Sequence, residues 1–283
     1  MERGAVEEWD ARLGWMGALV SDDEIAHRRA LDHYLRVARE TREARAAYDT
    51  VVLRVPRSVS AEETAWQRFR AAWLRTPAAA LLAEPLAAAE VPDWGGLPYA
   101  LTYLEWEARY PTEWTRHAKV WSTKQRLIRL LAVPGHHAEA RSRLVDLVEA
   151  VVYRRHRCKD REYSRIARVV DGEDLRARLT KAQDSGEPWT RDQAGHVLWL
   201  LHNPQIPINR TNWFRWLSIN QDTPQPPPGT SPTEPTAPTA PTARPELSEA
   251  AEPPAPPDLP DPPNPPDHPN PPNHPDPPPP PLV

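Results

Sequence analysis

The aromatic residues and the prolines divide this chain into two parts that cannot share one fold. All 12 Trp, all 7 Tyr and both Phe lie before residue 222, whereas 27 of the 62 residues from Asp222 to Val283 are Pro. A segment of that composition cannot bury enough apolar surface to offset the entropy lost on ordering. We therefore expect a folded body over 1–221 and a disordered, proline-rich tail over 222–283.

The expected tail is acidic and has a regular register. It holds nine acidic residues and one basic residue, Arg244, for a net charge of −8; because the whole chain carries −4, residues 1–221 carry +4. From Asp258 to Asp276 every third residue is Asp or Asn, which matches the three residues per turn of polyproline II. The register favours a solvated spacer, and a secondary hypothesis is a ligand for an aromatic-lined groove on a partner.

The body contains the start and stop signals of helices that are joined by short turns. Capping boxes are predicted at Ser21 with Glu24 and at Ser60 with Glu63, and the one strand-like run, at 50–55, is too short to make a sheet. Links of two to six residues require consecutive helices to lie antiparallel. We expect an all-α antiparallel bundle or short helical-repeat array, with a candidate internal boundary at the Pro- and Gly-rich stretch 91–98.

One part of the body has a spacing of residue types that is typical of a known helical repeat. Behind a start at Glu187 and Pro188 the chain carries the order R-x-x-A-x-x-x-L-x-x-L, formed by Arg191, Ala194, Leu198 and Leu201. Over 136–202 this pattern resembles HEAT-like helical repeats. The resemblance implies stacked helix pairs, and in that family the concave face of the stack binds other macromolecules.

Sequence features also indicate a compartment. The first residues lack a secretory signal pattern, and no apolar run reaches the ~18 residues that a membrane span needs. The single cysteine, Cys158, excludes an intrachain disulfide framework. We expect a cytoplasmic protein that does not enter a membrane.

The main candidate site surrounds that cysteine. Seven basic residues lie within fifteen positions and form a candidate interaction surface: Arg154, Arg155, Arg157, Lys159, Arg161, Arg165 and Arg168. The favoured interpretation is a helical surface, because an apolar edge recurs there at i, i+3, i+4 and i+7, formed by Tyr163, Ile166, Ala167 and Val170. The basic field could lower the pKa of the Cys158 thiol, but no base and orienting group accompany it at catalytic spacing.

The sequence signals for metal binding, phosphate binding and hydrolysis are weak or absent. The potential zinc donors His136, His137, His156 and Cys158 lack paired ligand spacing, and no phosphate-binding loop or common hydrolase motif occurs. We therefore assign no catalytic residue, no metal and no cofactor. Glu105 and Glu107 flank Trp106, but two residues apart on a helix they diverge, so we expect both to be solvated.

Three functional hypotheses remain. The leading one is a non-enzymatic, intracellular protein-interaction or scaffold module with a protein partner. The alternative is a nucleic-acid-associated protein, because basic and aromatic residues interleave at Trp114, Arg116, His117, Lys119, Trp121, Lys124, Arg126 and Arg129. Against it, +4 is a small basic excess for a nucleic-acid domain. A second alternative is an enzyme whose site is assembled across helices.

Overall fold

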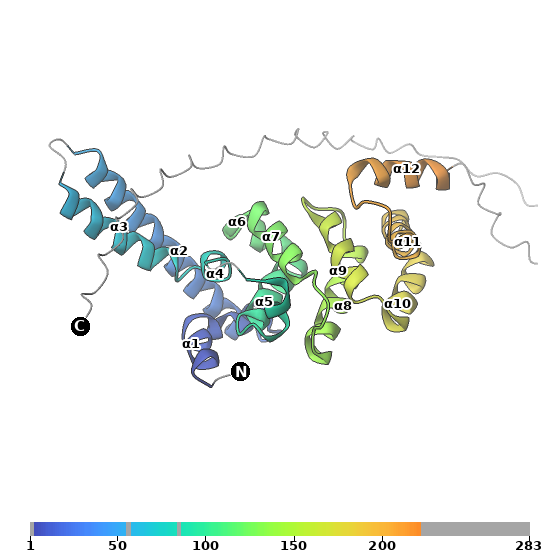
Figure 1. The fold of residues 1–283 in the computed structure, drawn as a ribbon, viewed down its shortest axis with the longest axis horizontal. Helices are drawn as coiled ribbons and strands as arrows, with labels where there is room; N and C mark the ends of the chain where they lie inside the picture. The colour runs from blue at the N-terminus through green and yellow to red at the C-terminus, as the bar shows by residue number, and fades with distance from the viewer. Residues whose placement is uncertain (1–2, 55–57, 84–85, 222–283) are drawn as a thin grey trace, which may run out of the picture. The chain divides into compact units, whose positions relative to one another are not determined.

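The computed structural model describes residues 3–54, 58–83 and 86–221, and every regular element in those ranges is a helix (Figure 1). The all-α prediction is confirmed. The expected tail, 222–283, lies outside the described residues. In chain order the first elements are α1 (Arg3–Leu13), η1 (Gly14–Val20), α2 (Glu24–Val52), α3 (Val59–Trp73), α4 (Pro77–Ala80) and η2 (Ala88–Asp93). The remaining elements are α5 (Leu97–Arg109), α6 (Pro111–His117), α7 (Trp121–Leu131), α8 (Ala138–Tyr153), η3 (Asp160–Glu162), α9 (Tyr163–Val169), α10 (Glu173–Gln183), α11 (Pro188–His202) and α12 (Arg210–Gln221).

Two helix starts differ from the predicted capping boxes. Asp23, not Ser21, caps α2, since its carboxylate accepts hydrogen bonds from the backbone N–H groups of Ile25 and Ala26. Ser58, not Ser60, caps α3 by accepting from the N–H of Ala61. In both cases several capping residue types stand close together, and the box pattern alone does not decide between them.

The strand-like run at 50–55 is also corrected. Its first three residues form the last turn of α2, which continues for 29 residues from Glu24 to Val52. Val51 and Val52 are half-buried in that helix, so the helical context prevails over the β propensity of valine.

The candidate boundary at 91–98 separates two helical elements, η2 and α5, that pack into one core. Val91 and Leu97 belong to the same buried cluster as Leu13 and Leu201. Gly95 lets two segments approach closely: a Cβ added there would lie 2.8 Å from Cδ1 of the Trp9 indole. The stretch therefore forms a tight turn that packs against Trp9 of α1.

Much of the core lies along α5, which contacts both η1 and α8. Tyr103, Leu104 and Trp106 are at most 1% exposed. Trp114 of α6 is fully buried and packs edge-on against Tyr103, with ring centroids 6.0 Å apart. The packing of these large rings holds α5 in place, and α5 carries Glu107 of the candidate site described below.

The helices from α8 onward contact one another, although not always in chain order: α9 packs against α11. α8 packs against α9, α10 and α11, and α10 packs along α11. The predicted apolar edge of α9 is confirmed, because Tyr163, Ile166, Ala167 and Val170 are all buried. The HEAT-like resemblance of 136–202 stays a prediction. Among the described residues, no helix combines the length and the apolar character that crossing a bilayer requires.

Candidate functional site

The connection between α8 and α9 is the part of the basic stretch that departs from a helix. α8 ends at Tyr153, Arg154 is extended, and Lys159 adopts a left-handed conformation with φ 69°. Asp160 closes this loop: its Oδ2 accepts from the Arg157 N–H at 2.7 Å, and its own N–H donates to the Arg157 carbonyl at 3.0 Å. The predicted helical surface at 154–168 is therefore wrong for its first six residues, which form an irregular loop.

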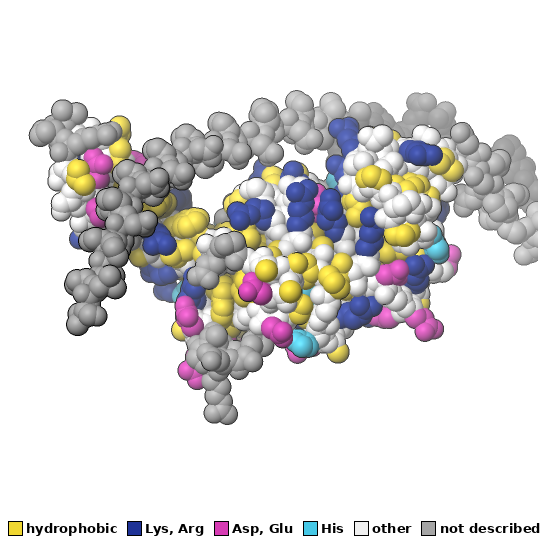
Figure 2. Space-filling view, in the orientation of Figure 1, with side chains coloured by type: hydrophobic (Ala, Val, Ile, Leu, Met, Phe, Trp, Pro, Cys, Tyr) yellow, Lys and Arg dark blue, Asp and Glu magenta, His cyan; other side chains and the backbone are white. Residues whose placement is uncertain are grey.

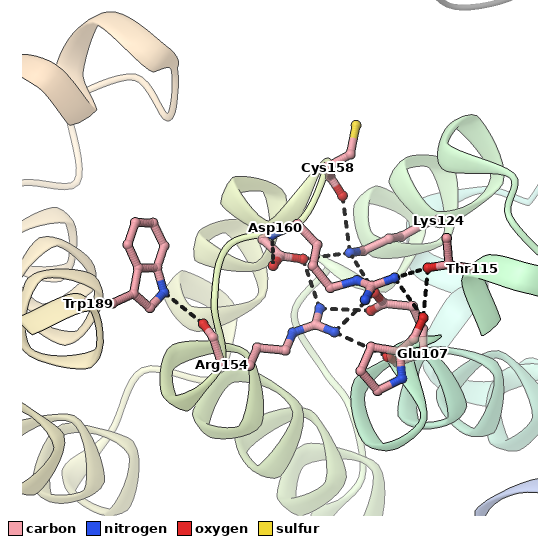
Figure 3. Close-up of polar contacts among 9 residues, drawn as sticks. Glu107, Thr115, Lys124, Arg154, Cys158, Asp160 and Trp189 are labelled. Carbon is pink, nitrogen blue, oxygen red and sulfur yellow. Dashed lines mark hydrogen bonds and ion pairs between the residues drawn. The ribbon is translucent and has the colours of Figure 1, made fainter. Parts of the chain in front are cut away.

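Beneath the loop lies a group of five charged residues, which we call the buried ion cluster: Glu107, Lys124, Arg154, Arg157 and Asp160 (Figure 3). Lys124 Nζ lies 2.5 Å from Asp160 Oδ1 and 3.3 Å from Glu107 Oε1. The side chains of Lys124 and Glu107 are both 0% exposed. The cluster therefore joins α5, α7 and the α8–α9 loop inside the fold.

The two arginines close the cluster around Glu107. Arg154 donates to both carboxylate oxygens, at 3.0 and 2.8 Å, and also to Asp160 Oδ1 at 2.8 Å. Arg157 Nε lies 3.0 Å from Glu107 Oε1. Three cations thus surround two anions, for a net charge of +1 if every member is ionised.

Opposite charges decide the ionisation state of the buried carboxylate. Burial raises the pKa of Glu107, but Lys124, Arg154 and Arg157 together bring that pKa below its ordinary value. Burial lowers the pKa of Arg154, and Asp160 and Glu107 more than compensate, so this pKa is raised. Glu107 is consequently held as a carboxylate in the dry interior.

The cluster also anchors the loop backbone. Lys124 Nζ donates to the Cys158 carbonyl at 3.2 Å, and Arg157 donates to the Pro111 carbonyl at 2.8 Å and to the Thr115 hydroxyl. On the other side, the Trp189 indole N–H donates to the Arg154 carbonyl at 2.7 Å. The loop is fixed between α6 and α7 on one flank and α11 on the other.

The seven predicted surface cations therefore have different surroundings. Arg154 and Arg157 belong to the buried ion cluster, so their inclusion in an exposed surface is corrected. Arg165 pairs with Glu162 at 2.7 Å, and Arg168 donates to three carbonyls at the end of α11 and beyond it, those of Leu200, Asn203 and Ile206. Among the seven, only Arg155, Lys159 and Arg161 are exposed or half-exposed with neither an ion pair nor a side-chain hydrogen bond to the described residues.

Further cations that form no ion pair with the described residues come from α6, α7 and the link between them. Together with the three loop residues they define what we call the cationic face: Arg116, Lys119, Arg126, Arg155, Lys159 and Arg161. Lys119 and Arg157 both lie near the Trp121 ring, 5.9 and 5.8 Å from its centroid, which places the α6–α7 link beside the loop. Figure 2 shows Lys and Arg side chains gathered along the upper edge of the body, over α6, α7 and α9.

Several residues of the nucleic-acid hypothesis are buried or paired. Trp114 and Lys124 are 0% exposed, and Arg129 pairs with Glu162 at 2.8 Å. The expectation that Glu105 and Glu107 are solvated is wrong: Glu105 pairs with Arg143 at 2.8 Å, and Glu107 is the centre of the buried ion cluster.

The potential zinc donors are separated. His136 contacts the Leu131 carbonyl, His137 lies 3.0 Å from Asp93, and the His156 ring packs against Trp189. Cys158 is exposed. Within the ranges that the structure describes, no group of three or more His, Cys, Asp or Glu side chains could hold a metal ion.

A sequence signal for the buried ion cluster does exist. Glu107 continues the apolar series Ala100, Tyr103 and Leu104 at i, i+3, i+4 and i+7, which puts it on the buried face of α5. Lys124 opens the equivalent series of α7, followed by Leu127, Ile128 and Leu131. A charge of each sign on a buried helix face indicates a buried pair, although it does not identify the partners.

No protein-family model, curated protein or solved structure matches this chain. Inference about function therefore depends on the buried ion cluster and the cationic face.

Proposed function

We propose that this chain is a non-enzymatic protein-interaction module whose cationic face binds an acidic segment of a protein partner. The observation that carries the proposal is the contrast within one loop. Arg154 and Arg157 are neutralised inside the fold, whereas Arg155, Lys159 and Arg161 have no acidic partner in the described part of the chain. Anchored cations without partners are available to a ligand of opposite charge.

The contrast with other arginines of the body supports this proposal. Arg178 contacts three acidic side chains, Asp146, Glu149 and Asp174, at 2.7 to 3.0 Å. Arg176 pairs with Asp171 at 2.7 Å. Because intramolecular partners neutralise these cations, a surface that lacks such partners attracts anions more strongly.

Anchoring of the loop favours binding as well. The loop backbone is held by Lys124, Arg157 and Trp189, so it loses little conformational freedom when a ligand docks. Preorganisation of this kind removes the backbone part of the entropic cost of association.

An acidic protein segment fits the face better than a nucleic acid does. Nonspecific binding of single strands uses open aromatic rings on which bases stack. Trp114, Trp213 and Trp216 are buried, and cations already pack against the half-buried Trp121. The nucleic-acid alternative therefore keeps its phosphate-binding charges but loses most of its stacking platform.

The enzyme alternative receives less support. A general base needs a carboxylate that can accept a proton near neutral pH, whereas the cations around Glu107 lower its pKa. Glu105 is held by a bidentate contact with Arg143. We keep the cytoplasm as the proposed compartment, because a lone cysteine is typical of a reducing environment.

The test compares two triple charge reversals. Arg155→Glu, Lys159→Glu and Arg161→Glu together change the cationic face, and Arg29→Glu, Arg36→Glu and Arg42→Glu make the same charge change on the exposed side of α2. The probe is a fluorescein-labelled oligoglutamate peptide, followed by fluorescence anisotropy. We expect the loop variant to bind at least about tenfold more weakly than the α2 variant, because three attractions become repulsions.

Each result bears on the proposal. Equal affinity in the two variants, or no binding of the peptide to the wild type at low salt, would contradict it. A labelled single-stranded oligonucleotide is the second probe. If it binds through the same three residues and clearly more tightly than oligoglutamate, with steep loss of affinity as salt rises, the nucleic-acid function replaces the proposed one.

A further inference from the structure

The helix α12 is held on the body by two indole rings. Trp213 and Trp216 are 9% and 7% exposed, and no other described side chain of this helix is buried. Both rings pack against His196 of α11. The Trp216 ring comes so close to the α11 backbone that a Cβ added at Gly195 would lie 2.8 Å from its Cζ2. The inner side of α12 is therefore fixed on α11, above which it lies in Figure 1.

The same inner side places α12 beside the loop between α8 and α9. The Trp213 ring packs against the Trp189 ring, with centroids 5.9 Å apart. The Trp189 indole N–H donates to the Arg154 carbonyl of the loop at 2.7 Å (Figure 3), and the Trp189 ring also contacts the His156 ring, 5.8 Å away. A single indole therefore links α12 to the loop that carries half of the cationic face.

An aromatic side chain with a cation over its ring lies on the exposed part of α12. Arg210, Phe214 and Leu217 are spaced at i, i+4 and i+7, so they share one side of the helix. Phe214 is 49% exposed, and the Arg210 guanidinium lies over its ring, 5.2 Å from the centroid. Leu217 is half-buried, and Arg210 and Arg215 are exposed and form no ion pair with the described residues. We call Arg210, Phe214 and Leu217 the α12 flank.

We infer that the α12 flank extends the binding surface, and that the acidic segment bound by the cationic face carries an apolar side chain that packs on Phe214. The inference rests on the proposed function and adds the sequence class of the partner, which is a set of acidic residues around an apolar one. Continuity supports it, because Trp189 alone links α12 to the loop. Charge supports it too, because Arg210 and Arg215 can pair with the acidic neighbours of the apolar residue.

An apolar side chain supplies what charges alone do not. Charge pairs speed association and select the sign of the partner, whereas an aromatic ring that becomes buried contributes affinity and discrimination. A nucleic-acid base fits the flank less well, since the Arg210 guanidinium already lies over the ring on which a base would stack. An aliphatic side chain does not need a flat approach. A wholly apolar partner also fits less well, because it would desolvate the arginines without supplying an opposite charge.

The experiment compares two series of fluorescein-labelled peptides by fluorescence anisotropy at low salt. In the first series oligoglutamate carries one leucine at successive positions, and in the second series glutamine stands at the same positions to match the lost charge. We expect the wild type to bind the best leucine peptide at least about fivefold more tightly than its glutamine counterpart, because the leucine buries apolar surface on Phe214. Phe214→Ala should bring this ratio to about one, whereas Phe214→Leu keeps an apolar surface and should retain most of it.

Ile25→Ala is the matched control, because it removes an apolar side chain that is 65% exposed on α2, and it should keep the wild-type ratio. Equal affinities of the two series for the wild type, or a preference for leucine that survives Phe214→Ala, would overturn the inference while leaving the proposed function in place. Failure of the parent oligoglutamate to bind would remove the proposed function and the inference with it. Circular dichroism of each variant separates a change in the ratio from a loss of fold.

Discussion

Glu107→Gln is expected to lower the free energy of unfolding by about 3–5 kcal/mol, as for other buried pairs that lose one partner. The substitution keeps the size and shape of the side chain but removes the charge that Lys124, Arg154 and Arg157 share. Asp160 is then the only anion of the buried ion cluster, beside its three cations, and the side chains of Lys124 and Asp160 are at most 3% exposed. The free energy of unfolding falls because positive charge is then buried without an anion to balance it.

Urea denaturation followed by circular dichroism measures this change, with Glu43→Gln as the matched control. Glu43 pairs with Arg39 at 3.9 Å on the surface of α2, and both side chains are more than 60% exposed. An exposed pair of this kind contributes about 0–1 kcal/mol. Similar losses in the two variants would mean that the cluster is not the stabilising feature that its burial indicates.

The second large effect is a loss of about 3 kcal/mol of stability as the pH falls from 6.5 to 4, caused by His196. Burial, with a smaller contribution from Arg161, lowers the pKa of His196 to about 4. The unfolded chain therefore binds a proton between pH 6.5 and 4 that the folded chain does not bind. This stability is fully present above pH 6.5 and is lost progressively below it.

The surroundings of His196 explain why it stays neutral. It is 3% exposed, its Nε2 has no hydrogen-bond partner among the described residues, and its ring lies 4.8 Å from the Trp213 ring and 5.6 Å from the Trp216 ring of α12. Protonation would place a charge at the contact between α11 and α12.

His196→Phe should flatten the pH dependence of stability between pH 4 and 6.5 while preserving the aromatic contacts. The pKa values of His33 and His156 are also lowered by burial, so the informative quantity is the difference between the wild-type and variant curves. Urea midpoints at several pH values give both curves. Parallel curves would show that His196 does not carry the effect.

Helices were predictable where apolar residues recur with a strong 3.6-residue period. The apolar edge predicted for α9, formed by Tyr163, Ile166, Ala167 and Val170, is buried along its whole length. Helix starts were less predictable, because Asp23 and Ser58 stand within a few residues of equally suitable caps. Local signals identify an element better than they fix its first residue.

The site was only partly predictable, because its contacts are distant in sequence. The loop conformation depends on Asp160 meeting Lys124, 36 residues earlier, and Arg154 meeting Glu107, 47 residues earlier. Ion pairs between helices follow no sequence period. Composition therefore located the basic stretch around Cys158, and only the three-dimensional fold separates its buried cations from its exposed ones.

Amide hydrogen exchange at Arg157 tests most directly whether the buried ion cluster holds the loop that presents the cationic face. The Arg157 N–H donates to the buried Asp160 carboxylate at 2.7 Å. The account predicts strong protection of this amide in the wild type, approaching that of the α5 backbone, and a marked loss of protection in Glu107→Gln under conditions where α5 stays protected. Exchange of the wild-type Arg157 amide at the rate of an unstructured peptide would contradict the account.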